Sequence, residues 1–187
     1  MTFDEMVDLL VNKHGCVPVE PLVDRERDDI FTQRFKKSIE TVKMTAAWLK
    51  SRGYKDVKVV EPRIAPSYSQ WRKYVDNGDI YVGKHRVEVK GLGHKYKFTK
   101  SSEYPWNKVI VCAKHSFDMA TPKPVVYLLW NSARTHVGCI PTSTYNDWKV
   151  KTIKDPNYPH NQDFYVTGKE NMIVMERFKK PEQLSMI

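Results

Sequence analysis

The chain has 187 residues, of which 41% are hydrophobic, so it is long and apolar enough for one folded domain, and global disorder is excluded. Its 31 Lys and Arg residues outnumber its 22 Asp and Glu residues, which gives a formal charge of +9. A protein this basic tends to bind a polyanion, most commonly nucleic acid, although a basic surface can also serve solubility alone.

Cysteine usage and the N-terminal residues predict a cytoplasmic protein. Cys16, Cys112 and Cys139 are too few and too scattered for a disulfide framework, and no C-x-x-C pair marks a zinc site. We therefore expect them to be small core residues in a reducing compartment. No apolar run approaches the ~20 residues that a membrane span requires. The acidic start Met1-Thr2-Phe3-Asp4-Glu5 lacks the features of a signal peptide.

Helical spacing dominates the first third of the chain. Residues 3–13 have the spacing of a short helix, and residues 18–29, with two prolines and many charges, have the composition of a connector. A stronger helix is predicted from about Phe31 to Arg52. Its apolar residues advance by four, three, four and three positions along one stripe, and they are Phe35, Ile39, Val42, Ala46 and Leu49. Gly53 then occupies a position suited to helix termination.

Short apolar or β-branched runs in the rest of the chain predict strands. The first, at residues 57–60, ends before Pro62, and Asn77-Gly78 has the composition of a turn. Further strands are expected at residues 79–82, 85–90, 109–113, 125–130 and 137–140, and residues 164–166 and 172–175 are expected to form a last hairpin after an exposed loop at 154–163. This order of elements predicts an α/β or α+β domain with a central mixed β-sheet flanked by helices.

Two neighbouring strands, Asp79 to Val82 and His85 to Lys90, carry the most informative pattern. Gly83-Lys84 between them suits a two-residue type II′ turn, with Gly in its first position. That turn sets Asp79 opposite Glu88, with β-carbons roughly 4.5–5.5 Å apart. Alternation directs Ile80, Val82, Val87 and Val89 to a core, and Asp79, Tyr81, Arg86, Glu88 and Lys90 to the opposite face.

The opposed carboxylates predict a metal site. Two acidic groups at this separation repel each other unless a cation neutralises them, and hard oxygen ligands suit Mg²⁺, which keeps several of its own waters. Lys90 lies two residues beyond Glu88 on the same face, where its ammonium can orient a water or meet a phosphate. With the carbonyl of Val89, these groups form a site for metal-assisted phosphodiester hydrolysis. The metal lowers the pKa of a bound water and offsets charge on the transition state.

Asp79, followed nine residues later by Glu88-Val89-Lys90 on the next strand, resembles the PD-(D/E)XK nuclease superfamily, which includes restriction endonucleases and Holliday-junction resolvases. The order of helix, strand, Asp strand and Glu-x-Lys strand is similar to the core of that superfamily. The resemblance implies a restriction-endonuclease-like fold, Mg²⁺ bound by Asp79 and Glu88 and replaceable by Mn²⁺, catalysis by Lys90, and DNA as the substrate. It also implies a catalytic glutamate on the preceding helix, for which Glu40 is the matching candidate, and it makes a homodimer an expected state.

The resemblance covers roughly residues 31–115. We therefore expect residues 1–30 to be an N-terminal helix and connector, and residues 31–187 to form one nuclease domain with a C-terminal extension from about residue 116. Gly78 stands where the family's motif has proline, a position that varies within the superfamily. Endonuclease action is the first expectation, but exonuclease action and an RNA substrate stay open. The small size is compatible with a phage protein that acts in the host cytoplasm.

Basic and aromatic residues interleave after the Glu-x-Lys strand, from Gly91 to Lys100. This pattern is typical of chains that track a phosphate backbone and stack on bases. The residues predicted to bind nucleic acid are Lys84, Arg86, His94, Lys95, Lys97 and Lys100. A solvated loop is an equally good interpretation of the run. Beyond it, Tyr104, Trp106 and Asn107 could line the site, as residues after the Glu-x-Lys strand often do in the family that the chain resembles, but for Trp106 a place in the core is favoured.

Three other interpretations stay open. Asp79 and Glu88 could be an exposed pair on a solvated sheet face, balanced by Arg86 and Lys90. The chain could be a non-catalytic nucleic-acid-binding or accessory protein that uses the same basic surface. A zinc-dependent hydrolase that uses histidines is disfavoured, because the sequence lacks a ligand spacing such as H-x-x-x-H.

Overall fold

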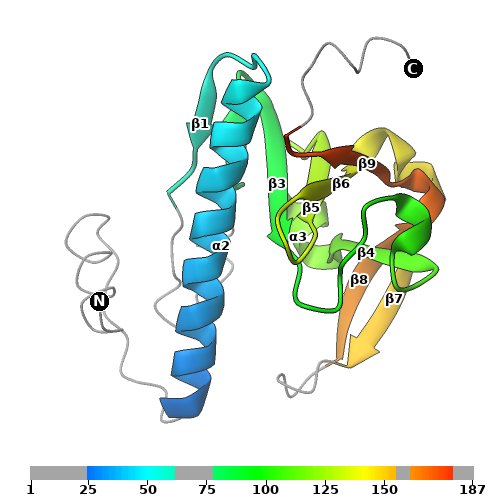
Figure 1. Cartoon of the computed structure of the whole chain (residues 1–187). Coiled ribbons are helices and arrows are strands. Elements are labelled where there is room, and N and C mark those ends of the chain that lie inside the picture. Colours follow the sequence, from blue (N-terminus) through cyan, green and yellow to red (C-terminus); the bar gives the residue numbers. More distant parts are fainter. Residues whose placement is uncertain (1–24, 62–77, 155–160, 179–187) are drawn as a thin grey trace.

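The computed structural model describes residues 25–61, 78–154 and 161–178, with the side chains of the first segment described from residue 36. Its elements, labelled as in Figure 1, are α2 (Arg25–Ser51), β1 (Val57–Val59), β2 (Ile80–Val82), β3 (His85–Gly91), β4 (Lys108–Ala113), α3 (Lys114–Met119), β5 (Val126–Trp130), β6 (His136–Pro141), β7 (Lys149–Lys154), β8 (Asn161–Gly168) and β9 (Ile173–Glu176). Three short 3-10 helices lie at Ser101–Glu103, Thr142–Asp147 and Lys169–Asn171. The predicted helix at residues 3–13 lies outside the described residues.

Helix α2 begins at Arg25, six residues before the predicted start, so the predicted connector at 18–29 is wrong for its last five residues. These residues carry no apolar periodicity, but they contain no Pro or Gly, and Arg and Glu favour helix. The predicted end is confirmed. Gly53 has a φ of +87°, its N–H donates to Lys50 O, and Tyr54 N–H donates to Leu49 O, which is the hydrogen-bond pattern of a Schellman motif.

Six of the described strands form one mixed sheet, here called sheet A, in the order β1-β2-β3-β5-β6-β9. Neighbours are antiparallel except β3 and β5, which are parallel. A parallel pair needs a long crossover connection, and residues 92–125 between β3 and β5 supply it. The predicted α+β class with a central mixed sheet is confirmed at this coarse level.

A second sheet, here called sheet B, has the order β4-β8-β7 among the described strands. This arrangement corrects two predictions. Residues 164–166 and 172–175 do not form a hairpin, because β8 pairs with β4 and β7 while β9 joins sheet A beside β6. The predicted loop at 154–163 also contains the last residue of β7 and the first three of β8; strand β7 was missed because its lysines dilute the apolar signal.

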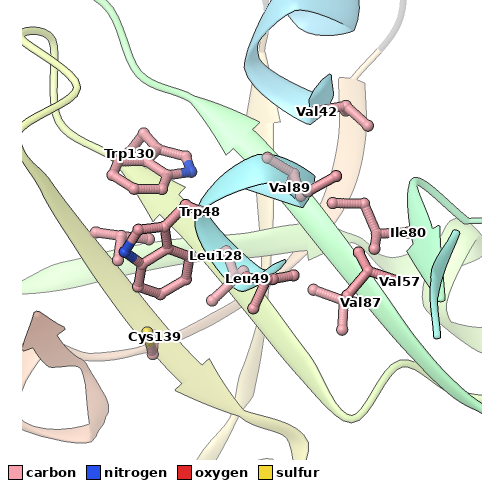
Figure 2. Packing of buried hydrophobic residues seen from close by; sticks show 12 residues of the cluster. Val42, Trp48, Leu49, Val57, Ile80, Val87, Val89, Leu128, Trp130 and Cys139 are labelled. Carbon is pink, nitrogen blue, oxygen red and sulfur yellow. The ribbon is translucent and has the colours of Figure 1, made fainter. Parts of the chain in front are cut away.

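Sheet A has a buried layer on each face. On one face, Val42, Trp48 and Leu49 of α2 pack against Val87 and Val89 of β3 and against alternate residues of β5 and β6 (Figure 2). On the other face, the intervening residues of β5 and β6 belong to a second cluster with sheet B, made of Phe98, Tyr104, Val109, Val111, Cys112, Phe117, Tyr127, Leu129, Ile140, Trp148, Tyr165 and Met172. The order of layers is therefore helix, sheet A, sheet B, and this order decides what surrounds the predicted site.

Candidate active site

The β2–β3 hairpin has the predicted register. Its pairs are Ile80–Val87, Tyr81–Arg86 and Val82–His85. Gly83 has a φ of +58° while Lys84 does not have a positive φ, which fits a type II′ turn. The paired residues of the two strands end at Ile80–Val87, and Asp79 directly precedes β2, so the predicted position of Asp79 opposite Glu88 stays a prediction. The N–H of Val89 donates to Asp79 Oδ2 at 2.7 Å, so the carboxylate of Asp79 is aimed across the hairpin at β3.

The face of the hairpin that carries the carboxylates is only partly exposed, since Asp79, Tyr81, Glu88 and Lys90 are all half-buried. Arg86 is only 4% exposed, and its Nε donates to Glu88 Oε1 at 2.6 Å. The Glu88 side chain is 12% exposed. The two carboxylates are therefore half-buried and not exposed, whereas the balance of Glu88 by Arg86 agrees with the alternative interpretation of a structural charge pair. The assignment of Arg86 to a nucleic-acid surface is wrong, since strand alternation predicts which face a side chain takes but not what covers that face.

Lys90 is the third residue of the predicted motif, and it contacts a strand of sheet B. Its Nζ donates to the carbonyl of Val111 on β4 at 2.5 Å. Burial lowers the pKa of Lys90, and the nearby Cys112, Glu88 and Asp79 oppose that shift. Desolvation therefore outweighs the negative charges around the ammonium. The three residues of the predicted motif lie in one electrostatic environment.

Two further polar residues line this environment, and sequence reasoning missed both. Tyr127 on β5 pairs with Glu88 in the parallel ladder, so the two side chains lie on the same face of sheet A. Tyr127 and Cys112 are hydrogen-bonded to each other, and burial raises the pKa of both groups. Neither residue carries a local signal, because each reaches the site through a pairing or a sheet contact that is distant in sequence.

The oxygen ligands that this group offers are of the kind that Mg²⁺ binds, although only two side chains supply them. Asp79 and Glu88 supply hard carboxylate oxygens, and the carbonyl of Val89 directly follows Glu88 in sequence. Within the described ranges, no group of three or more His, Cys, Asp or Glu side chains lies close enough to hold a metal. Glu40 is exposed on α2 and does not join the two carboxylates. Waters or substrate oxygens would have to complete the coordination, which is a common arrangement for Mg²⁺.

The other predicted nucleic-acid residues are exposed, but they do not form one surface. Lys84 lies at the turn that precedes β3, whereas His94, Lys95, Lys97 and Lys100 follow the far end of the strand. The seven residues of β3 separate the two groups by about 20 Å. The segment from Leu92 to Lys100 has no regular strand or helix, as expected for a loop.

Comparisons of the chain with protein-family models, with curated proteins and with solved structures find no match. Among the described residues, no helix combines the length and the apolarity that crossing a membrane requires.

Proposed function

We propose that this protein is a Mg²⁺-dependent nuclease that hydrolyses DNA phosphodiester bonds at Asp79, Glu88 and Lys90. The observation that carries the proposal is that Asp79 and Glu88 both lie near the Lys90 ammonium, which is held against β4 by its bond to Val111 O. Both carboxylates act electrostatically on the Lys90 ammonium. The Val89 N–H holds the Asp79 carboxylate toward β3. The order α2, β1, β2, β3 supports the proposed restriction-endonuclease-like core.

Each residue has a distinct part in the proposed reaction. Asp79 and Glu88 hold the cation, with Val89 O as a third ligand; the cation supplies a water of lowered pKa and offsets charge on the phosphate. Lys90 meets the phosphate or orients the attacking water. Its lowered pKa brings the ammonium closer to exchanging a proton near neutral pH. Mn²⁺ replaces Mg²⁺ because both accept oxygen ligands.

The proposal requires two contacts to open. Arg86 has to release Glu88 Oε1 before that oxygen can bind a cation, and Lys90 has to leave Val111 O before it can reach a phosphate. A cation would neutralise Glu88 in place of the guanidinium, so the exchange keeps the buried charge balanced. The described arrangement is therefore the resting state of the proposed enzyme.

Asp79→Asn is the sharpest variant for the test. The amide oxygen can still accept the Val89 N–H bond, so the hairpin is retained, but the charge that attracts a cation is gone. We expect wild-type protein to cleave supercoiled plasmid or linear duplex with Mg²⁺ and not with EDTA. The variant should cleave about 100-fold more slowly or worse. Nicking of the plasmid would indicate endonuclease action, and loss from the ends of the linear duplex would indicate exonuclease action.

Asp147→Asn is the matched control, since Asp147 is an exposed aspartate on the 3-10 helix Thr142–Asp147. Its cleavage rate should equal that of the wild type. Circular dichroism and a melting curve of each variant establish that the fold persists. Cleavage by Asp79→Asn at the wild-type rate would rule out the proposed site.

A second candidate function is supported by one observation: Glu88 and Lys90 already have protein partners in Arg86 and Val111 O. In that case the charges are structural, and the protein binds nucleic acid without cleaving it. Binding would weaken steeply with salt, would not depend on Mg²⁺ and would not change in Asp79→Asn. The same pair of proteins therefore separates the two functions. For either function we place the protein in the cytoplasm, where reduced thiols such as Cys112 and Cys139 persist.

A further inference from the structure

An aromatic cluster, here called the aromatic face, lies beyond the end of β3. It consists of Tyr96, Phe98, Tyr104 and Trp106. The ring centroid of Tyr96 lies 5.1 Å from that of Trp106 and 5.5 Å from that of Tyr104, and Phe98 lies 5.7 Å from Tyr104. Phe98 is 1% and Tyr104 5% exposed, whereas Trp106 is 47% exposed. The expectation that Trp106 lies in the core is therefore wrong: buried rings support it, and its own face meets solvent.

The loop that carries the aromatic face is held by hydrogen bonds at several points. Tyr96 O accepts the N–H of Ser132 at 2.7 Å, and Phe98 O accepts from Asn131 Nδ2 at 3.0 Å. The Glu103 carboxylate accepts from both the N–H and the hydroxyl of Thr99. These bonds order the rings before any ligand arrives, so little conformational entropy is lost when one binds.

Lysines lie near two rings of the aromatic face in sequence. Lys95 and Lys97 flank Tyr96, Lys108 follows Trp106 by two residues, and all three are exposed. A flat π surface beside ammonium groups fits a ligand with aromatic rings and regularly spaced negative charges. An unpaired stretch of nucleic acid has both, while the bases of a duplex hide their faces in the stack.

We propose that the aromatic face binds single-stranded nucleic acid, with an unpaired base stacked on Trp106 and its phosphates beside Lys95, Lys97 and Lys108. Resting on the proposed nuclease function, this defines the substrate class as DNA with unpaired nucleotides next to the cleaved bond. Strand β4 joins the two regions, because Lys108 begins the strand and Val111 holds Lys90. Three residues of strand span about 10 Å, so a bound strand of a few nucleotides reaches from one region to the other.

The test is a binding measurement in EDTA, where no cleavage occurs. Fluorescence anisotropy of a labelled oligothymidylate of about 12 nucleotides gives the dissociation constant, and an unlabelled duplex of the same length is the competitor. We expect Trp106→Ala to raise the dissociation constant about 5- to 150-fold, the range that loss of one stacked base produces. Trp106→Phe should restore most of the affinity. The duplex should compete poorly.

Salt dependence separates stacking from charge. Trp106→Ala should leave the slope of log affinity against log salt unchanged, whereas Lys97→Ala should reduce it by about 0.7, as expected when one phosphate contact of a single strand is lost. Tyr54→Ala is the matched control. Tyr54 is an exposed aromatic residue next to a lysine, but it lies after α2, near the turn at the opposite end of β3. Its loss should leave binding unchanged.

Equal affinity of Trp106→Ala and wild type for the oligothymidylate would overturn this proposal, and so would duplex binding as tight as single-strand binding. Neither result bears on the nuclease proposal, which depends on cleavage with Mg²⁺. Conversely, absence of cleavage by the wild type would not bear on the aromatic face, because the oligonucleotide measurement is made in EDTA.

Discussion

Arg86 is a charged side chain with almost no exposed surface, and it lies beside Glu88 on one strand. A buried ion pair adds little net stability compared with apolar residues, but removal of one partner leaves an uncompensated buried charge. The Arg86–Glu88 pair is therefore a point where the fold and the proposed chemistry compete for the same carboxylate.

We predict that Arg86→Met lowers the free energy of unfolding by about 3–5 kcal/mol, because Glu88 would keep its charge without this guanidinium. Denaturant unfolding at neutral pH measures the change. The double variant Arg86→Met/Glu88→Gln should recover part of the loss. If the proposed cation site is correct, millimolar Mg²⁺ should stabilise Arg86→Met by mass action. A change of less than about 1 kcal/mol in the single variant would show that the pair is not a buried ionic contact.

For individual residues, the sequence predicted which charged residues form the group but not what surrounds them. The prediction that Asp79 lies opposite Glu88 came from a two-residue turn and strand alternation, which are local properties. The burial of Arg86, the contact between Lys90 and Val111 O, and the neighbourhood of Tyr127 all depend on strands that are remote in the chain. A charge at an alternate strand position is normally solvated, so nothing local marks these charges as enclosed.

Between elements, one hydrogen bond joins α2 to the centre of sheet A. Trp130 Nε1 donates to Thr45 Oγ1 at 2.7 Å, and both side chains are fully buried. The Thr45 hydroxyl in turn donates to Thr41 O. Trp48 packs edge-on against Trp130 with ring centroids 5.4 Å apart (Figure 2). The Thr45–Trp130 hydrogen bond is therefore a polar contact among apolar side chains.

Thr45→Val should lower the free energy of unfolding by about 1–3 kcal/mol, since the buried indole N–H of Trp130 loses its acceptor while the side-chain volume stays nearly constant. Thr41→Val is the control: the Thr41 hydroxyl donates to Lys37 O within the same helix, and its loss should cost less than about 1 kcal/mol. Guanidinium unfolding of both variants gives the comparison. Equal costs for the two would contradict a role of the Thr45–Trp130 bond in docking the helix.

Among the elements, those with a local signature were predicted well. The stripe of α2, the glycine at its end and the β2–β3 hairpin follow from spacing and turn chemistry. The assignment of strands to two sheets was missed, because β4 and β8 look like any other short apolar runs. Strand β7 has lysine at three of its six positions and lies at the edge of sheet B among the described strands. Lysines at an edge discourage pairing with other chains, and they hide the strand from a search for hydrophobicity.

The molecule as a whole is tied together by β5 and β6, which contribute side chains to both buried clusters. Loss of either cluster therefore exposes one face of the strands that support the other. Several ionisable groups lie within these layers. Burial raises the pKa of the Cys139 thiol to about 12, and it also raises the pKa values of Cys112, Tyr104 and Tyr127.

These shifts predict alkaline unfolding. The unfolded chain releases the thiol protons from about pH 9, while the folded protein keeps them, so the folded state binds more protons and loses stability as pH rises above 9. Lys90 acts in the opposite direction, because its pKa is lowered and the unfolded chain binds its proton up to about pH 10.5. The free energy of unfolding should fall between pH 9 and pH 11, since the buried thiols and phenols outnumber this single amine.

Denaturant unfolding at successive pH values measures the slope. The free energy of unfolding of Cys139→Ala should fall less steeply with pH than that of the wild type over this range. The reason is that the variant lacks one thiol whose proton the folded state keeps. An unchanged slope in this variant would indicate that Cys139 ionises equally in both states.

The order of strands in sheet B also bears on biosynthesis. Among the described strands, β4 has β8 as its neighbour, and β8 begins at Asn161, 70 residues after β3 ends at Gly91 (161 − 91). A ribosome therefore completes the Asp79–Glu88 hairpin long before it makes the strand that anchors β4. Until then β4 lacks this pairing partner, so we expect the contact between Lys90 and Val111 O to become fixed only after β8 has been made. A chain that terminates before Asn161 would contain Asp79, Glu88 and Lys90 but would lack β8, the strand that pairs with β4.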